Sequence, residues 1–495
     1  MKETSQDYGY EFTISLVEAI EKWTKREERK NPDIFVYKGA NLRFALERAL
    51  YPRYSQNPEL IELFGKYKQQ GNIQMITSDY FKKIFLLLMC PNLEEKNILI
   101  KRQTLKKLLK KNIARGIRPI KRILSRVRTH NNYSQFQDMN VDTLLCANSP
   151  RFVQYIKTIM EKLPSIHYFS IGESMRSFFM INKLSFLNSS MFGRSISGFS
   201  NPYSYLESFG LTEMYDLMYE TLTTAKPKVV VTIEGCAAID EVTNQACKRL
   251  SIPCICIQQG WNNLAENGAR NMTFSKMLVW GKGFTELLQP YNPQQKFIVT
   301  GNHIIKSFSS SKNACNKIKT ISFFAQGTSQ VLTKRKINDF VELIISTAKT
   351  FPNLQVIVRE HPNFIGIVNR EKIKKITNIQ FMNPDEYSLS DVLEKSDLSV
   401  TIYSTTILES ISMDVVPLIV NMTGQPNYWP NIEAEHAGIE FRTTEQAEKT
   451  LASFANGVLH PSQFYDAMMQ FRKKYFSASG EKAAENIVRE ILSIT

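Results

Sequence analysis

The segment Pro227-Lys228-Val229-Val230-Val231-Thr232-Ile233 has the composition of a strand that is buried on both faces. Its residues are mostly apolar and β-branched, and an uninterrupted run of this kind is typical of a central strand in a parallel sheet. A helical pattern from Ala238 to Leu250 follows, and then a second apolar run, Pro253-Cys254-Ile255-Cys256-Ile257. A strand, a helix and a strand in this order predict a unit whose two strands are parallel.

The same alternation continues on both sides of this unit. Upstream, the pattern predicts strands at 141–146 and 166–170 and helices at 150–163 and 205–224. Downstream, it predicts strands at 276–281, 296–301, 318–324, 355–358, 379–382, 398–402 and 415–420, with helices at 334–350 and 404–413. We therefore expect an α/β protein of two Rossmann-like doubly wound domains that face each other across a cleft. Such sheets bind their ligands at the carboxyl ends of the strands.

Length and local composition predict where one domain ends and the next begins. A chain of 495 residues exceeds what one hydrophobic core usually organises. Residues 307–317 contain four serines and two lysines and form the predicted linker. We expect an N-terminal domain at 1–306 and a C-terminal domain at 318–470, with an amphipathic helix at 471–495 that packs back on the N-terminal domain.

Composition excludes several classes of protein. An apolar fraction of 43% and a charged fraction of 22% are those of an ordinary globular chain. No apolar stretch is long enough to cross a bilayer, and the first residues lack the apolar core of a signal peptide, so we expect a cytoplasmic protein. The cysteines are odd in number, seven, and lack the paired Cys or His spacing of a zinc site. We expect reduced thiols, no metal and no cofactor.

One segment accounts for much of the net charge of +15. Residues 101–128 contain twelve lysines and arginines and no acid, interleaved with leucine and isoleucine at helical spacing. We interpret the region near 95–130 as a basic helical insertion. Attraction to an anionic membrane surface is the favoured interpretation, which would make the protein peripheral at the inner face of the cytoplasmic membrane. A merely solvated basic face is the alternative, and nucleic acid is disfavoured because no recognisable module accompanies the charge.

Polar side chains with suitable chemistry follow three predicted strands of the C-terminal domain. His361 and Pro362 come directly after one strand, and a histidine there can donate to a phosphate oxygen or be an ordinary turn residue. Ser404, Thr405 and Thr406 follow another strand and open a helix, where hydroxyls and free backbone N–H groups attract an anion. Simple N-capping would explain one of these hydroxyls.

Two further features belong to the same predicted edge. Glu409 lies one turn into the helix and could accept hydrogen bonds from ribose hydroxyls, or be no more than an acid near a helix N-terminus. Gln326, Gly327 and Thr328 follow the first strand of the domain and form a small polar turn against which a nucleotide can pack.

These motifs together resemble those of a known enzyme superfamily. Arg359-Glu360-His361-Pro362, followed by Ser404-Thr405-Thr406, is similar to the paired His-Pro and Ser/Thr motifs of GT-B glycosyltransferases of bacterial surface polysaccharides. Members include sialyl-, polysialyl- and Kdo-transferases and related glycerophosphotransferases. The resemblance covers about residues 225–425 and implies that His361 and the hydroxyl cluster hold the phosphate of a CMP-sugar. It also implies that phosphate charge is managed without a metal ion.

The N-terminal domain should then hold the acceptor and the general base. Glu234 ends a buried strand and resembles the acid before glycine in the polysialyltransferase motif, although the second adjacent acid of that motif is missing here. Asp240, at the start of the next helix, is the fallback base or a simple helix cap. Gln259, Gly260 and Asn262 follow the neighbouring strand and are the candidate acceptor-binding residues.

The sequence thus predicts an inverting, metal-independent glycosyltransferase with a nucleotide-sugar donor, which the resemblance implies to be a CMP-activated acid sugar. Its expected acceptor is a lipid-linked glycan or an oligosaccharide of a surface polysaccharide such as capsule or lipopolysaccharide. Three alternatives stay open: a UDP-sugar 2-epimerase, a CDP-polyol phosphotransferase, and a noncatalytic membrane- or nucleic-acid-binding protein built around residues 101–128.

Overall fold

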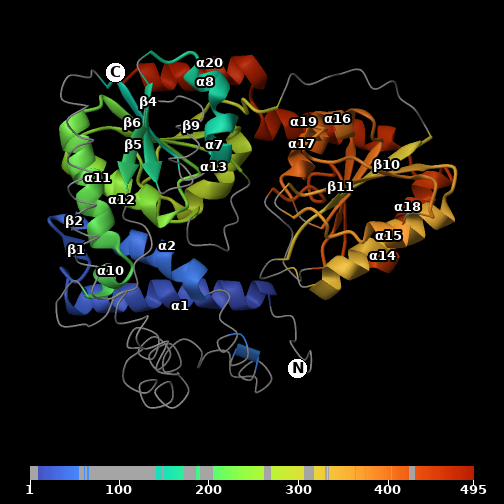
Figure 1. Cartoon of the computed structure of the whole chain (residues 1–495), viewed down its shortest axis with the longest axis horizontal. Coiled ribbons are helices and arrows are strands. Elements are labelled where there is room, and N and C mark those ends of the chain that lie inside the picture. The colour runs from blue at the N-terminus through green and yellow to red at the C-terminus, as the bar shows by residue number, and fades with distance from the viewer. Residues whose placement is uncertain are drawn as a thin grey trace, which may run out of the picture.

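The computed structural model divides the chain into two α/β lobes (Figure 1). The residues that it describes are 9–54, 61, 64–65, 141–147, 150–164, 166–171, 186–189, 204–260, 269–305, 317–328, 332, 334–362, 364–373, 375–402, 404–422 and 430–494. The predicted basic insertion near 95–130 and most of the predicted linker lie outside these ranges.

The N-terminal lobe contains a seven-stranded parallel sheet in the order β5-β4-β3-β6-β7-β8-β9. Its strands are β3 (Thr143–Ala147), β4 (Ile166–Ile171), β5 (Phe186–Ser189), β6 (Val229–Ile233), β7 (Cys254–Ile257), β8 (Lys276–Val279) and β9 (Phe297–Val299). Every residue of β6 and β7 is buried, as their apolar sequences predict. The chain proceeds outward from β3 and later returns to place β6 beside it, so the strand order reverses between β3 and β6.

Helices cover both faces of this sheet. One face is covered by α11 (Leu211–Ala225) and α12 (Ala238–Arg249), with α10 (Ser204–Ser208) beside them. Over α12 lie α2 (Arg43–Tyr54) and α1 (Gly9–Lys30), which form an outer layer together with the hairpin of β1 (Val36–Tyr37) and β2 (Ala40–Asn41). The other face packs against α7 (Pro150–Tyr155), α8 (Lys157–Met160) and α20 (Gly480–Leu492).

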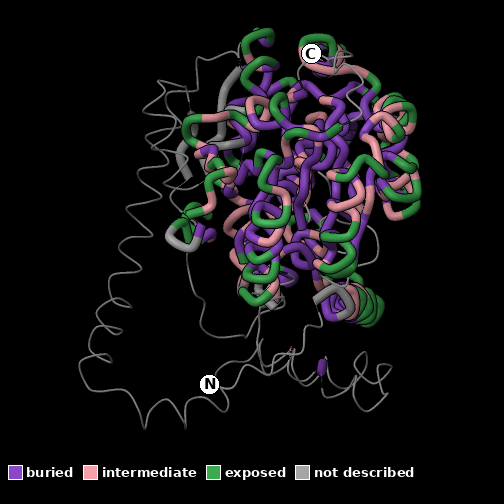
Figure 2. Tube along the Cα trace, turned by 90° about the vertical axis from the view of Figure 1, so that its right-hand side faces the viewer, coloured by how far each residue is buried: buried purple, intermediate pink, exposed green. Residues whose placement is uncertain are grey.

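The C-terminal lobe contains a six-stranded parallel sheet in the order β12-β11-β10-β13-β14-β15. Its strands are β10 (Thr320–Ala325), β11 (Gln355–Glu360), β12 (Ile379–Phe381), β13 (Leu398–Thr401), β14 (Val416–Val420) and β15 (Ile439–Phe441). Its helices are α14 (Lys334–Thr350), α15 (Arg370–Ile373), α16 (Leu389–Glu394), α17 (Thr406–Ser412) and α18 (Thr444–Ala455). Here the strand order reverses between β10 and β13. The predicted α/β class with two doubly wound sheets is therefore confirmed, and Figure 2 shows the buried residues concentrated toward the interior.

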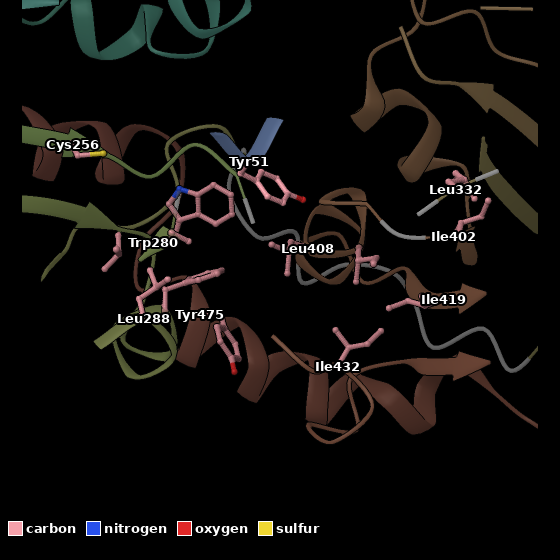
Figure 3. Packing of buried hydrophobic residues seen from close by; sticks show 14 of the residues in the cluster. Tyr51, Cys256, Trp280, Leu288, Leu332, Ile402, Leu408, Ile419, Ile432 and Tyr475 are labelled. Atoms are coloured by element: carbon pink, nitrogen blue, oxygen red, sulfur yellow. The ribbon is translucent and has the colours of Figure 1, made fainter. Parts of the chain in front are cut away.

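The last part of the chain connects the two lobes. A 3-10 turn, η4 (Pro461–Phe464), leads into α19 (Tyr465–Tyr475), which contacts α17 of the C-terminal lobe. In the N-terminal lobe, α19 contacts α13 (Lys282–Leu288), which continues into η3 (Gln289–Tyr291). Apolar side chains of both lobes belong to one continuous cluster, part of which is drawn in Figure 3.

Two glycines allow the returning chain to approach the N-terminal sheet closely. A Cβ on Gly281 would lie 2.3 Å from the backbone carbon of Tyr475, and one on Gly301 would lie 2.5 Å from the carbonyl oxygen of Ala478. Beyond this crossing, Lys276 Nζ at the start of β8 binds the Glu490 carboxylate at 2.8 Å, which holds α20 against the sheet. The predicted boundary at residue 470 falls inside α19, and the chain crosses at 476–480.

Several helices differ in extent from the sequence patterns. The helix predicted at 150–163 is interrupted at Ile156, and the one predicted at 205–224 is divided at Gly210, whose φ of 68° is left-handed. The helix predicted from 404 begins at Thr406. Apolar periodicity indicates which face is buried, but it does not show where the backbone leaves helical geometry, because the period continues across a single turn residue.

Candidate functional site

The carboxyl ends of three adjacent strands bring the predicted donor-binding residues together. β10 lies between β11 and β13, so His361, Gln326 and Ser404 all follow strands that are direct neighbours. The backbone N–H of His361 donates to the carbonyl of Ala325 at 2.9 Å, and Thr401 Oγ1 lies 3.5 Å from Gln326 Oε1. His361 and the hydroxyl cluster, distant in sequence, therefore flank the point where the strand order reverses, which is where doubly wound sheets bind ligands.

The loop that carries His361 is organised by a buried carboxylate. Glu360 is only 2% exposed, and its Oε1 accepts hydrogen bonds from the backbone N–H groups of Gly366 at 3.0 Å and Val368 at 2.8 Å. Arg370 Nη2 lies 3.4 Å from its other oxygen. These bonds hold the loop after β11 in one arrangement. Pro362 is exposed on this loop, directly after His361.

Gly327 is required by close packing. A Cβ at this position would lie 2.2 Å from the ring of Phe364, which is 41% exposed. The ring of Phe364 is in turn 5.6 Å from the ring of His361, centroid to centroid. The polar turn after β10 and the histidine loop after β11 are thus packed together, and Thr328 next to Gly327 is exposed.

The three hydroxyls after β13 have different local roles. Ser404 Oγ accepts a hydrogen bond from the backbone N–H of Thr406 at 3.2 Å and lies 2.9 Å from Thr406 Oγ1. Thr405 occupies the N-cap position of α17 without a capping bond from its side chain. Ser404 precedes the N-cap residue and accepts the N–H of Thr406, the first residue of α17, which is only seven residues long. The groups at this strand end that can bind an anion are therefore the hydroxyls themselves more than the dipole of the short helix.

Glu409 is the most perturbed titratable group of this edge. Burial raises its pKa from 4.5 to about 8, and its Oε2 is enclosed without a hydrogen-bond partner among the described residues. A carboxyl with this pKa is largely protonated at neutral pH, so it can donate a hydrogen bond as well as accept one.

In the N-terminal lobe, Glu234 lies where the strand order reverses. It follows β6 directly, and its backbone has a left-handed φ of 68°, as does that of Gly235 at 72°. Left-handed backbone is strained for a residue with a side chain, and such strain is concentrated at functional sites. Glu234 Oε1 lies 3.5 Å from the position that a Cβ on Gly260 would occupy. The carboxylate is therefore next to the turn that follows β7.

The predicted acceptor-binding residues are only partly described. Gln259 is 6% exposed, and its Oε1 has no hydrogen-bond partner among the described residues. Gln258, beside it, joins the ends of β7 and β8. Its Oε1 accepts a hydrogen bond from the backbone N–H of Trp280, and its backbone carbonyl accepts one from the Trp280 indole N–H, each 3.0 Å long. Asn262 lies outside the described residues.

Asp240, the fallback base, is inside the protein. It is 3% exposed, and its Oδ2 accepts a hydrogen bond from the backbone N–H of Ala237 at 3.0 Å. Burial raises the pKa of Asp240 to about 7, against the lowering effect of that backbone hydrogen bond and of Arg48. Asp240 caps α12, as one of the two sequence interpretations holds, and it titrates near neutrality close to Glu234.

Sequence patterns missed the contribution of the N-terminal helices to this region. Arg48 of α2 forms a buried ion pair with Glu241 of α12, with Nη1 and Oε2 3.1 Å apart. The available signal was a charged pair, Glu47-Arg48, within an otherwise apolar stretch. Only the packing of α2 on α12 shows that this arginine faces the carboxylates beyond β6.

Two features are absent from the part of the chain that the structure describes. No group of three or more His, Cys, Asp or Glu side chains among them is arranged to hold a metal ion. None of the helices in the described ranges has both the length and the apolar character needed to cross a membrane.

No protein-family model and no curated protein matches this chain. Among solved structures it is similar to UDP-GlcNAc 2-epimerase from Neisseria meningitidis bound to UDP-GlcNAc, with 16% identity, a TM-score of 0.48, and coverage of 71% of this chain and 99% of that one. It is also similar to MurG from Acinetobacter baumannii, with 11% identity, a TM-score of 0.48, and coverage of 71% and 99%. A third is the glycotransferase of kitacinnamycin, with 12% identity, a TM-score of 0.46, and coverage of 71% and 99%. At these levels of sequence identity, structural similarity concerns the fold alone. The fold of this chain is assigned from its own strand order.

Proposed function

We propose that this chain is a glycosyltransferase that takes a sugar from a nucleotide-activated donor. The observation that carries the proposal is the convergence of His361, the turn at Gln326 and the hydroxyls from Ser404 to Thr406 on three adjacent strand ends. A histidine, hydroxyls and loop backbone at the reversal point of a doubly wound sheet suit a nucleotide's phosphates. A carboxylate at the corresponding point of the other sheet suits a general base.

In this proposal the C-terminal lobe binds the donor. His361 and the hydroxyls donate hydrogen bonds to the phosphate oxygens and stabilise the charge that develops as the nucleotide leaves. The neutral carboxyl of Glu409 hydrogen-bonds to the ribose. Because these groups manage the charge, the transfer proceeds without a metal ion. The sequence motifs favour a CMP-activated acid sugar as the donor.

Glu234 acts as the base in the N-terminal lobe. Its carboxylate takes the proton of the acceptor hydroxyl while that oxygen forms a bond to the anomeric carbon of the donor. The bond between the anomeric carbon and the phosphate oxygen breaks, and the nucleotide leaves with the electron pair. Attack from the face opposite the leaving group inverts the configuration. Gln259 and Gly260, next to the carboxylate, would orient the acceptor.

Donor turnover tests this proposal. The full chain is incubated with CMP-sialic acid, CMP-Kdo, UDP-hexoses and CDP-glycerol, each with and without an oligosaccharide acceptor, and free nucleotide is measured. Nucleotide release from one donor only in the presence of acceptor is the expected result. A UDP-sugar 2-epimerase, the nearest rival, would instead convert its donor without acceptor. Absence of turnover with every donor would contradict the proposal.

Two substitutions separate the roles of the lobes. His361→Ala should abolish the rise in melting temperature that the donor nucleotide produces, because a ligand stabilises the folded state in proportion to its affinity. Glu234→Gln should keep that rise and lose turnover by at least about a hundredfold, as is usual when a positioned base is removed. The exposed residues His436 and Glu445 offer matched controls, His436→Ala and Glu445→Gln, which should behave as wild type.

We further propose that the acceptor is presented at a membrane, to which residues 101–128 bind. Twelve cations within this segment would bind anionic lipid at about 1 kcal/mol each near the surface. Co-sedimentation with vesicles of phosphatidylglycerol and phosphatidylcholine should fall steeply as salt is raised, and with replacement of the segment's lysines by glutamine. Equal binding to neutral vesicles would contradict this attachment.

A further inference from the structure

The loop after β11 exposes two adjacent apolar side chains beside the proposed phosphate site. Phe364 is 41% exposed and Ile365 is 49% exposed. A single exposed apolar side chain is ordinary on a protein surface and needs no functional reason. Phe364 is different, because two neighbouring strand ends hold its ring in a defined position.

The ring of Phe364 lies against the turn after β10. A Cβ at Gly327 would lie 2.2 Å from Cγ of this ring and 2.3 and 2.5 Å from the adjoining carbons, Cδ1 and Cδ2. Nearly equal distances to these atoms place Gly327 over the face of the ring and not at its edge. Any larger residue at position 327 would displace the ring. One face is therefore covered by backbone, and the exposed part of the ring is its other face and its rim.

Hydrogen bonds fix the backbone on both sides of Phe364. Its N–H donates to the carbonyl of His361 at 2.8 Å and closes a four-residue turn. Within this turn the rings of His361 and Phe364 are 5.6 Å apart, centroid to centroid, with an angle of 52° between their planes. Beyond the turn, the Glu360 carboxylate accepts from the N–H groups of Gly366 and Val368. The aromatic surface is thus preorganised, which lowers the entropy lost when a ligand binds.

The position of this surface identifies the kind of ligand that it suits. Because β10 lies between β11 and β13, the ring covers the strand end that separates His361 from Ser404. A flat apolar face beside anion-binding groups suits a molecule that is anionic at one end and flat and aromatic at the other. A nucleotide has this form, and nucleobases stack on aromatic side chains.

We propose that the exposed face of Phe364 stacks on the nucleobase of the donor. This inference rests on the proposed function and adds a residue that binds the donor through its base. Every nucleobase has a π face, so stacking increases the affinity for nucleotides without strong discrimination among bases. Phe364 takes no part in the transfer itself.

Comparison of CMP with ribose 5-phosphate tests the proposal on the full chain, because both have a phosphate and only CMP has a base. CMP affinity is measured by titration calorimetry, and that of ribose 5-phosphate by displacement of CMP. Phe364→Ala should weaken CMP binding by about tenfold or more and leave ribose 5-phosphate nearly unchanged. A merely loosened loop would weaken both. UMP, AMP and GMP are titrated in parallel, and the nucleotide that binds most tightly is used for the variants.

Two further variants define the role of the ring. Phe364→Trp keeps an aromatic face and should retain CMP affinity. The fluorescence of the new indole, measured against the four native tryptophans, should change with CMP and not with ribose 5-phosphate. Val458→Ala is the control, since it shortens an apolar side chain that is 71% exposed after α18, and it should bind both ligands as wild type does.

The possible outcomes separate this proposal from the proposed function. Equal losses for CMP and ribose 5-phosphate in Phe364→Ala would mean that the ring only supports the loop, and would overturn the proposal. Unchanged CMP affinity with reduced sedimentation on phosphatidylcholine vesicles would overturn it in favour of a lipid contact. Absence of binding by every nucleotide would overturn both proposals. A base-dependent loss without acceptor-dependent turnover would support the role of Phe364 and refute the glycosyltransferase alone.

Discussion

Replacement of Glu409 by glutamine should stabilise this protein in alkaline solution. The Glu409 side chain is partly buried and its Oε2 is enclosed without a partner among the described residues, so ionising the carboxyl in the C-terminal lobe is unfavourable. Glutamine has nearly the same shape and cannot ionise. The substitution therefore removes the cost of the buried charge while changing the packing little.

The size of the effect follows from the displaced pKa. Burial raises the pKa of Glu409 from 4.5 to about 8, so the neutral form stabilises the fold below pH 4.5, and this contribution is lost as pH rises to 8. Each pH unit within that interval is worth about 1.4 kcal/mol, which gives at most about 5 kcal/mol in total and about 3 kcal/mol between pH 6 and pH 9. Wild type loses this stability on going to pH 9, and Glu409→Gln does not.

Urea unfolding of both proteins at pH 6, 7, 8 and 9 measures this difference. The exposed Glu445→Gln variant is the control, and it should follow the wild-type pH dependence because its carboxylate is solvated. The free energy of unfolding of Glu409→Gln should increase relative to that of wild type at each step from pH 6 to pH 8, and the difference should level off above pH 8. Curves for wild type and Glu409→Gln that stay parallel across the whole range would refute the assignment of a neutral buried carboxyl.

Two more predictions concern a close backbone contact and the hydrogen bonds of a buried carboxylate. Gly281→Ala should destabilise the chain by about 1–3 kcal/mol in urea unfolding, because its methyl group would lie 2.3 Å from the Tyr475 backbone. The control Gly260→Ala, whose methyl group would have its nearest neighbour at 3.5 Å, should unfold almost as wild type does. Equal urea midpoints for Gly281→Ala and wild type would contradict the prediction. Glu360→Ala should reduce the rise in melting temperature that the donor nucleotide produces, because the N–H of Gly366 loses its acceptor and the loop after β11 is released. An unchanged rise would mean that this loop does not bind the nucleotide.

The strands that form the two sheets were predictable from local sequence. Runs such as Val229–Ile233 and Cys254–Ile257 are apolar throughout because a central parallel strand is buried on both faces, and this requirement is visible without knowing its neighbours. Helix limits were less predictable. Gly210 lies in the turn between α10 and α11, and a left-handed residue leaves the apolar period around it unbroken.

The sequence also indicated which residues follow strands, and so which belong to the ligand-binding edge. His361 and Ser404 could be assigned to strand ends on this basis. That those strands are separated only by β10 is a property of the strand order. Strand order depends on how crossover helices pack, and no short stretch of sequence contains that information.

Local sequence by itself therefore determined the α/β class, the repeated strand-helix units and the chemical types of the residues at the strand ends. The tertiary structure alone decided the protonation state of Glu409, the burial of Asp240 and the presence of Arg48 beside the acids of the N-terminal lobe. The physical reason is that pKa values depend on desolvation and on charges brought close by folding, and both come from residues that are remote along the chain.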